Sequence, residues 1–306
     1  MRRMLVTGAD GMVGGYVPEV FGDWHLTLTG LLDGYKKLDV RDPGAVMNTM
    51  MEVQPDLVLH LAAATDVDRC EQEPDFAFHS NAIGTQNIAL ACQAIGVPLV
   101  YVSTSGVFWG DNPNPYTEFD APKPANVYGQ SKLAGEQIVC SLLQRFFIVR
   151  AGWMIGGGEK DKKFIGKIIQ LISEGRRELS IVSDKLGSPV YAKDFLNGIK
   201  VLVDTGYYGI YHMVNEGMVS RYDVALEIRE ALNRPEVNIR PVSSAYFPLP
   251  APRARSEALR NLKLELLGIF KMRKWDEAVR DYIAREFVGV PVAEKGPKNL
   301  VTASYQ

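Results

Sequence analysis

The chain has 306 residues, a length typical of two domain-sized units. Its 34 Lys and Arg residues nearly balance 36 Asp and Glu residues, which argues against a nucleic-acid binder that works through a generally basic surface, so no nucleic-acid partner is expected. Hydrophobic residues make up 46% and charged residues 23%, close to the globular average, which argues against a disordered chain.

Short apolar runs alternate with helical segments through the first half of the chain. Strands are expected at residues 4–7, 25–29, 57–61, 99–103 and 146–150. Helices are expected at residues 12–21, 43–53, 76–95 and 127–144. Such alternation indicates βαβ units, whose parallel strands are buried on both faces. The first half therefore predicts an α/β fold with a doubly wound parallel (Rossmann) sheet.

The pattern changes after about residue 150. Helices are expected at residues 164–174, 194–204, 220–232 and 275–287, a strand at 209–214, and an ordered loop at 241–252. We interpret residues 1–152 as a dinucleotide-binding domain, to which the chain returns at about 186–216. Residues 153–287 are interpreted as a smaller, mostly α-helical substrate-binding domain. Residues 288–306 show no periodicity and are expected to form a flexible tail.

The cysteines and the apolar runs indicate a cellular compartment. Cys70, Cys92 and Cys140 are widely spaced and form no CxxC pair, so neither a disulfide framework nor a zinc site is expected. The apolar run at residues 4–7 is too short for a signal peptide, and no run approaches the roughly 20 residues of a membrane helix. We therefore expect a cytoplasmic protein without a membrane partner.

The first expected strand runs directly into a GxxGxxG turn, Gly8-Ala9-Asp10-Gly11-Met12-Val13-Gly14. In such a turn Gly8 permits the tight bend, Gly11 lets the backbone approach a pyrophosphate, and Gly14 lets the following helix pack on the strand. The anion would lie on free N–H groups at the start of that helix. Because the turn joins a first strand to a first helix, it predicts a dinucleotide site.

The cofactor is expected to be NAD or NADP, and the sequence leaves the choice open. An NAD site typically has an acidic residue at the end of the second strand, whereas this strand ends in Thr29-Gly30-Leu31-Leu32. Asp33 could reach the ribose, or Lys36 or Lys37 could pair with a 2′-phosphate, and the lysines fit a solvated loop equally well. Asp39-Val40 could line the adenine pocket.

Tyr128 and Lys132 form a YxxxK motif on an expected helix, where residues four apart lie on one face. A nearby ammonium group would lower the pKa of the tyrosine towards neutrality and make Tyr128 a usable proton donor. The motif follows a strand that ends in Ser103-Thr104-Ser105, whose carboxyl end would face the cofactor crevice. Thr104 or Ser105 is therefore expected to hydrogen-bond a substrate oxygen beside Tyr128.

Together with Leu61-Ala62-Ala63-Ala64 and Asn81, these motifs resemble the extended short-chain dehydrogenase/reductase family over roughly residues 3–287. The finer match is to the dTDP-4-dehydrorhamnose reductases. The resemblance implies an NAD(P)H-dependent enzyme that reduces the C4 keto group of a nucleotide-linked deoxysugar, converting dTDP-4-dehydro-L-rhamnose to dTDP-L-rhamnose. It implies a nucleotide-sugar substrate, and a homodimer is left open.

The resemblance also assigns roles to single residues. Tyr128 would protonate the C4 oxygen, Lys132 would hold the nicotinamide ribose, and Thr104 would polarise the carbonyl. Trp153 would stack on the sugar or line its pocket, with packing at a domain junction as the alternative. Cofactor contacts are expected for Gly8, Asp10, Gly11, Met12, Val13, Gly14, Asp39, Val40, Leu61, Ala62, Ala63, Ala64 and Asn81, and substrate contacts for Thr65, Val67, Ser105 and Arg253.

Arg253 is singled out together with Arg255, because both lie in a Pro-rich loop and could grip a diphosphate through paired hydrogen bonds. A solvated arginine pair is the alternative. The four histidines, His25, His60, His79 and His212, are interpreted as structural, since each stands alone within or beside an apolar run.

The chain departs from the reductase pattern at several positions. The family usually has Asp-Tyr after the Ser-Thr pair, and both help to hold the sugar, whereas this chain has Ser105 and Gly106. Trp109 stands where an acidic residue is usual and is a candidate to fill the vacated space. Gly15 and Val190 replace the carboxylates that bind Mg²⁺ in some members, so no metal is expected.

Two other functions stay open. A nucleotide-sugar epimerase of the same superfamily would retain NAD⁺ tightly. A non-catalytic regulatory subunit resembling the β subunit of methionine adenosyltransferase would bind a partner without reductase activity, although Tyr128, Lys132 and Thr104 argue against it. A dehydratase is disfavoured, because dehydratases carry Asp-Glu after the active Thr as acid and base. The fold alone does not decide among these functions.

Overall fold

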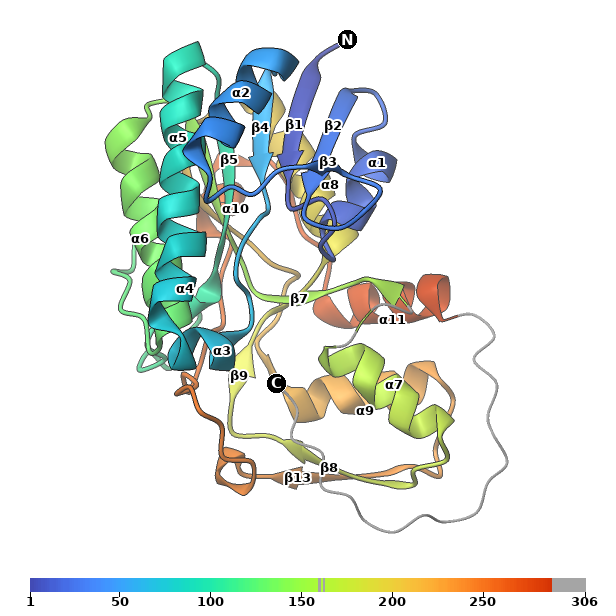
Figure 1. Cartoon of the computed structure of the whole chain (residues 1–306). Coiled ribbons are helices and arrows are strands. Elements are labelled where there is room, and N and C mark those ends of the chain that lie inside the picture. Colours follow the sequence, from blue (N-terminus) through green and yellow to red (C-terminus); the bar gives the residue numbers. More distant parts are fainter. Residues whose placement is uncertain (159–160, 162, 288–306) are drawn as a thin grey trace.

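The computed structural model describes residues 1–158, 161 and 163–287, so the predicted tail lies outside the described residues. Seven parallel strands form the main sheet in the order β11-β6-β5-β4-β1-β2-β3 (Figure 1). Their bounds are β1 Arg3–Thr7, β2 His25–Gly30, β3 Lys36–Lys37, β4 Leu57–His60, β5 Leu99–Thr104, β6 Phe146–Ala151 and β11 Gly209–Met213. The strand order runs outward in both directions from β1 and β4, which confirms the doubly wound sheet and places its switch point between them.

Helices cover both faces of this sheet (Figure 1). One apolar core joins the sheet to α2 (Pro43–Val53), α5 (Gly84–Ile95) and α6 (Val127–Leu142). A second core joins it to α1 (Val17–Val20), α8 (Ala192–Thr205) and α10 (Leu262–Leu267). Along β1, Leu5 belongs to the first core, whereas Met4 and Val6 belong to the second. This split explains why the strand is apolar throughout and does not alternate with polar residues.

The first predicted helix is much shorter than its expected span of residues 12–21. The structure has a 3₁₀ turn, η1 (Gly14–Tyr16), followed by the four residues of α1. Pro18 lies within α1 and has no N–H group to extend the hydrogen-bond ladder backwards. The turn that carries the glycines is therefore followed by only a short helical stretch. The N–H groups expected at the start of a helix are instead the amides of the turn itself.

The helix predicted at residues 76–95 is divided into pieces. It comprises α4 (Pro74–Phe78), a π-helical turn η2 (His79–Ile83) and α5, and it follows the short α3 (Val67–Gln72). Gly96, with φ +68°, ends α5 in the left-handed conformation typical of a helix C-terminus, and the last helical residue is 95 as predicted. Such π turns are frequent at functional sites, and this one carries Asn81.

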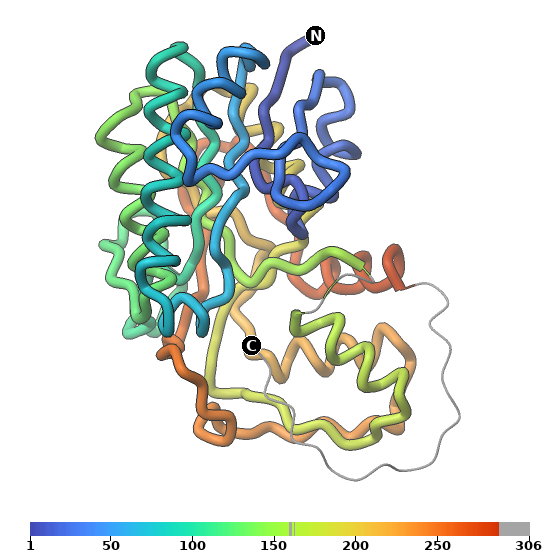
Figure 2. The backbone as a smooth tube through the Cα atoms, viewed as in Figure 1, coloured from blue at the N-terminus to red at the C-terminus, as the bar shows by residue number. Residues whose placement is uncertain are grey.

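The second half of the chain contributes to both parts of the molecule, as the tube in Figure 2 shows. The smaller part contains α7 (Phe164–Ser173), α9 (Arg221–Ala231) and the parallel pair β8 (Glu178–Val182) and β13 (Asn238–Val242). The predicted loop at 241–252 thus begins inside β13, and it contains the 3₁₀ turn η5 (Ser244–Tyr246). Two further pairs are parallel β7 (Trp153–Ile155) with β10 (Pro189–Tyr191), and antiparallel β9 (Leu186–Gly187) with β12 (Val219–Ser220).

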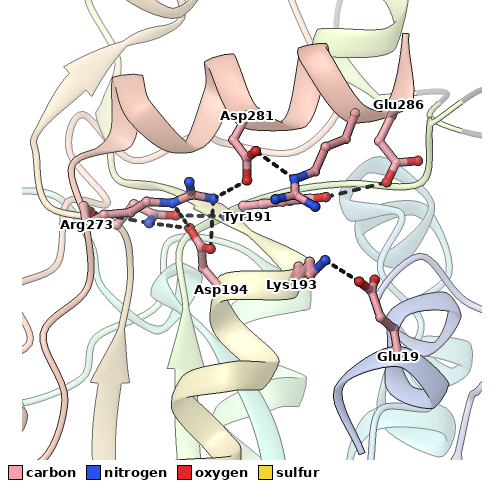
Figure 3. A network of polar contacts seen from close by, with 9 residues as sticks. Glu19, Tyr191, Lys193, Asp194, Arg273, Asp281 and Glu286 are labelled. Carbon is pink, nitrogen blue, oxygen red and sulfur yellow. Dashed lines mark hydrogen bonds and ion pairs between the residues drawn. The ribbon is translucent and has the colours of Figure 1, made fainter. Parts of the chain in front are cut away.

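A polar network joins the last described helix, α11 (Trp275–Glu286), to the start of α8 (Figure 3). Arg273 donates from Nε to Asp194 at 2.7 Å and from Nη2 to Asp281 at 2.9 Å. Beside it, Lys193 pairs with Glu19, and Tyr191 donates to Glu286. These contacts hold α11 against the sheet-bearing part. Within the described ranges, no helix is both long and apolar enough to cross a membrane.

Candidate active site

A pocket of about 730 Å³ opens at the carboxyl ends of β1, β4, β5 and β6 and is lined from both parts of the molecule. All but two of the residues to which the resemblance assigned a catalytic, cofactor or substrate role line it. They are Gly8, Asp10, Gly11, Met12, Val13, Gly14, Asp39, Val40, Leu61, Ala62, Ala63, Ala64, Thr65, Val67, Thr104, Ser105, Tyr128, Trp153 and Arg253. The two exceptions are Asn81 and Lys132, which lie behind the wall. Ligands of α/β proteins typically bind at this edge of the sheet.

The glycine turn has the shape that a dinucleotide needs. Gly8 has φ +67°, and a Cβ there would lie 2.6 Å from the backbone of Ala62. A Cβ on Gly14 would collide with the carbonyl of Ala9. Among the described residues, no acceptor is found for the amides of Met12 and Val13, which both line the pocket. These free donors fit the diphosphate of a dinucleotide.

Asp10 shapes the next part of the pocket by binding the end of β2. Its Oδ2 accepts hydrogen bonds from the amides of Leu31 and Leu32, at 2.7 and 3.0 Å. A Cβ on Gly30 would lie only 2.5 Å from the Asp10 carboxyl carbon. The carboxylate that the sequence lacks at the end of β2 is therefore supplied from the glycine turn, close to where a cofactor ribose would lie.

The lysines proposed for a 2′-phosphate lie elsewhere. Lys36 forms an ion pair with Glu52 of α2, with Nζ and Oε1 2.5 Å apart. Neither lysine, nor Asp33, is among the residues that line the pocket. Arg41, which the sequence analysis missed, does line it and is paired with Asp39, whose pKa its guanidinium holds below the usual range.

Tyr128 lies at the start of α6, with its phenol beside Thr104. Asn126 caps this helix by accepting from the amide of Gly129 at 2.9 Å. The Thr104 Oγ1 accepts from the amide of Gly106 at 3.1 Å, which fixes the hydroxyl at the strand end. Burial raises the pKa of Tyr128 to about 12, while its hydrogen bond with Thr104 acts in the opposite direction. The phenol is thus a protonated donor at neutral pH.

Lys132 does not lower the pKa of Tyr128 as the YxxxK spacing suggested. Its Nζ donates to the carbonyl of Val102 at 2.8 Å and lies over the Tyr101 ring, 4.2 Å from the centroid. Burial lowers the pKa of Lys132 to about 7, although the carboxylate of Glu136 opposes this shift. The expected effect on Tyr128 fails because burial dominates the pKa of both groups.

Asn81 acts through its neighbours and not by lining the pocket. Its Oδ1 accepts from the Ala64 amide at 2.8 Å, and its Nδ2 donates to the Ala64 carbonyl at 3.0 Å. The same Nδ2 also donates to Ser131 of α6 at 2.9 Å. Asn81 therefore ties the segment after β4, which lines the cofactor end, to the helix of Tyr128.

Arg253 lines the pocket but already has a carboxylate partner. Its Nη2 donates to Asp68 at 2.9 Å, and the Asp68 side chain is only 5% exposed. Arg255 is exposed and does not line the pocket. Trp109 also fails to fill the space beside Ser105 and Gly106: its side chain is 47% exposed and contacts Lys123 outside the pocket.

Besides Arg41, five charged lining residues were missed from the sequence: Asp66, Asp161, Lys163, Arg221 and Glu257. The Arg221 guanidinium lies 3.9 Å from the centre of the Trp153 ring and 4.9 Å from that of Phe164. Arg221 follows Ser220, which caps α9 through a capping box with Asp223. Its place directly after that cap is the signal that could have located it.

Comparisons with known proteins agree with this geometry. The family model described as the RmlD substrate binding domain matches residues 1–287. The dTDP-4-dehydrorhamnose reductase of Mycobacterium tuberculosis is 35% identical over 294 residues, covering 92% of each chain.

Two crystal structures of dTDP-4-dehydrorhamnose reductases resemble the model over almost their whole lengths. The Bacillus anthracis protein, in complex with NADP, is 36% identical with a TM-score of 0.87 and covers 92% of this chain and 99% of its own. The Yersinia enterocolitica protein is 39% identical with a TM-score of 0.85 and covers 93% and 99%. Together with the family model, these matches show that the chain belongs to the RmlD substrate binding domain family.

Proposed function

We propose that this chain reduces the C4 keto group of dTDP-4-dehydro-L-rhamnose to give dTDP-L-rhamnose, with NADH or NADPH as reductant. The observation that carries the proposal is one pocket that holds the glycine turn at one end and Tyr128 with Thr104 at the other. The names of the similar reductases support the same substrate. The resemblance inferred from the sequence and the family membership therefore agree.

The reaction needs a hydride and a proton at the carbonyl group. When bound, the reduced nicotinamide supplies the hydride to C4. Tyr128 donates the proton to the C4 oxygen, because its raised pKa keeps the phenol protonated at neutral pH. Thr104 accepts from the Gly106 amide, so its own proton is available for the same oxygen.

Lys132 and Asn81 are proposed to support this pair from behind. Lys132 keeps its predicted role towards the nicotinamide ribose, since its hydrogen-bond acceptor Val102 lines the pocket itself. Asn81 fixes the Ala64 backbone and the helix of Tyr128 in one arrangement. Asn81 is therefore proposed as a positioning residue, whereas Lys132 is proposed to act on the cofactor ribose.

Arg221 is proposed to hold the diphosphate of the nucleotide sugar, with Lys163 beside it. Burial lowers the pKa of Arg221 to about 10, which leaves the guanidinium charged at neutral pH. Among the described residues, no carboxylate lies within ion-pair distance of it, whereas Arg253 is paired with Asp68. A half-buried cation that lines a pocket and has no carboxylate within ion-pair distance is suited to an anionic ligand.

A reducing compartment fits the thiols. Cys70, Cys92 and Cys140 are free cysteines, and two of them are buried. We infer a cytoplasmic location from these thiols, and a homodimer stays a prediction.

The proposal is tested by following NADH and NADPH oxidation with dTDP-4-dehydrorhamnose and related 4-keto sugar nucleotides. Turnover that yields the reduced sugar, with a cofactor that exchanges freely, is expected. The absence of turnover with every such sugar would overturn the proposal. NAD⁺ that stays bound through purification would point to the epimerase alternative.

A further inference from the structure

One carboxylate at the sugar end of the pocket has no role in the mechanism above. Glu257 lines the pocket, and its Oε2 accepts a hydrogen bond from Ser105 Oγ at 3.2 Å. The backbone that carries it is fixed, since Glu257 N donates to Leu186 O at 2.8 Å and Leu186 N donates to Arg255 O at 2.9 Å. The carboxylate is therefore held at a set place in the wall.

The surroundings of Glu257 leave part of its carboxylate unused. In the part of the chain that the structure describes, Ser105 is the one side-chain donor to it. The Arg221 guanidinium is near enough for the Glu257 charge to oppose the burial that lowers the pKa of Arg221, but it lies beyond ion-pair distance. An ionised carboxylate offers about four acceptor positions. Because the residue faces the pocket, the remaining positions are available to a ligand hydroxyl.

The position of Glu257 also explains how the chain tolerates its departure from the reductase pattern. Ser105 and Gly106 place no carboxylate at the end of β5, and Trp109 lies outside the pocket. Glu257 reaches the same point from a segment 152 residues further along the chain and is joined there to Ser105. The site thus regains a negative charge at Ser105, near enough to add to the burial that raises the pKa of Tyr128.

We propose that Glu257 accepts a hydrogen bond from the hydroxyl on the sugar carbon next to the reacting carbonyl, and so selects sugars that carry this hydroxyl. The inference rests on the proposed function. In 4-dehydrorhamnose, the carbon on one side of C4 carries a hydroxyl, and the carbon on the other side carries a methyl group. A carboxylate stabilises the hydroxyl and would be desolvated without compensation by the methyl group, so the sugar lies with its C3 hydroxyl towards Glu257.

The experiment compares two substrates with the wild-type chain and with Glu257→Gln. The substrates are dTDP-4-dehydrorhamnose and its 3-deoxy analogue. Loss of a hydrogen bond to a charged acceptor is expected to lower kcat/KM for the hydroxylated sugar about 10- to 100-fold. The same substitution is expected to change kcat/KM for the 3-deoxy analogue by less than about threefold, because the analogue has no hydroxyl to donate.

Two further variants complete the comparison. Ser105→Ala removes the donor that orients the carboxylate and is expected to give a smaller loss, again confined to the hydroxylated sugar. Glu265→Gln is the matched control, since Glu265 pairs with Arg260 outside the pocket. It is expected to leave kcat/KM unchanged for both substrates. Cofactor affinity and thermal unfolding are measured for each variant, and Glu257→Asp is used if the Gln variant does not fold.

The outcomes separate this inference from the proposed function. If the wild-type chain is active and Glu257→Gln lowers kcat/KM equally for both sugars, the role of Glu257 is overturned and the proposed function stands. A wild-type chain that reduces no 4-keto sugar would overturn the proposed function, and this inference with it.

Discussion

Arg253 donates to Asp68 across 2.9 Å and thereby joins the segment before α10 to α3 at the mouth of the pocket. The other Asp68 oxygen accepts from the Ala251 amide at 2.9 Å, so one carboxylate holds both Ala251 and Arg253. Because the Asp68 side chain is 5% exposed, breaking the pair leaves a poorly solvated charge. We expect Arg253→Met, which leaves the Asp68 carboxylate buried without its cation, to lower the free energy of unfolding by about 3 kcal/mol, measured by urea denaturation.

The ion pair between Arg253 and Asp68 also leads to a prediction about substrate binding. If Arg253 affects substrate binding only through its ion pair with Asp68, Arg253→Met and Asp68→Asn raise the KM for the nucleotide sugar to a similar extent. The KM of the double variant is then no higher than that of either single variant. A much larger KM effect of the arginine variant alone would restore its predicted role in gripping the diphosphate.

Tyr128→Phe removes the proton donor without changing the shape of the helix. We expect kcat to fall at least about 100-fold, while the dissociation constant of the cofactor stays within about a factor of three. Stopped-flow reduction and cofactor fluorescence measure the two quantities. A rate close to that of the wild type would show that the proton comes from elsewhere.

Arg221→Met tests the diphosphate contact, with Arg229→Met as the control on the same helix. Arg221 lines the pocket, whereas Arg229 lies away from it and contacts Glu230. Loss of a charge-assisted contact is expected to weaken binding of the nucleotide sugar about 10- to 100-fold. Calorimetry with dTDP-rhamnose is the measurement, and equal affinities of the two variants would contradict the assignment.

Asp10→Asn tests whether the charge beside Gly30 influences the choice of cofactor. Asparagine keeps an oxygen acceptor for the amides of Leu31 and Leu32 but removes the negative charge. We expect NADPH to gain affinity relative to NADH, because the carboxylate repels a 2′-phosphate and accepts from a 2′-hydroxyl. Dissociation constants of both cofactors are measured at low salt, and an unchanged ratio would exclude this role.

The buried His212 is expected to lower the free energy of unfolding at acid pH. Burial, followed by the charge of Arg150, lowers its pKa to about 3 from the ordinary 6.5. The unfolded chain therefore binds a proton below pH 6.5 that the folded chain does not, so stability falls as the pH drops from 6.5 towards 3. At pH 4.5 the loss is roughly 2–3 kcal/mol for this group.

A substitution pair checks this assignment. In urea titrations between pH 7 and 4.5, His212→Gln is expected to flatten the pH dependence of the unfolding free energy. His25→Gln, at an exposed position, is the control. If the unfolding free energies of the wild type and of His212→Gln fall in parallel with pH, the loss of stability in acid comes from other groups, such as buried His60.

The glycine turn and the apolar strands were predictable because their signals are local. Gly8 and Gly14 leave no room for a side chain, and that constraint is written in seven consecutive residues. The YxxxK spacing likewise placed Tyr128 correctly on α6. The first helix was overestimated, since apolar periodicity does not reveal that α1 is only four residues long.

The charged part of the site could not be predicted in the same way. Glu257 meets Ser105 over 152 residues, and Arg253 meets Asp68 over 185 residues. No spacing rule connects such positions, because the contact depends on how the second part of the molecule folds over the sheet. The pKa of Tyr128 was misjudged for a related reason: helical spacing identifies a neighbour but not the degree of burial.

The sequence by itself determined the doubly wound sheet, the glycine turn and the candidate proton donor Tyr128, since each depends on residues that are adjacent or one helical turn apart. Only the tertiary structure decided which charged side chains line the pocket. It pairs Arg253 with Asp68, leaves Arg221 free for an anion and brings Glu257 to Ser105. Burial and long-range packing set those electrostatics, and neither is a property of a local stretch of chain.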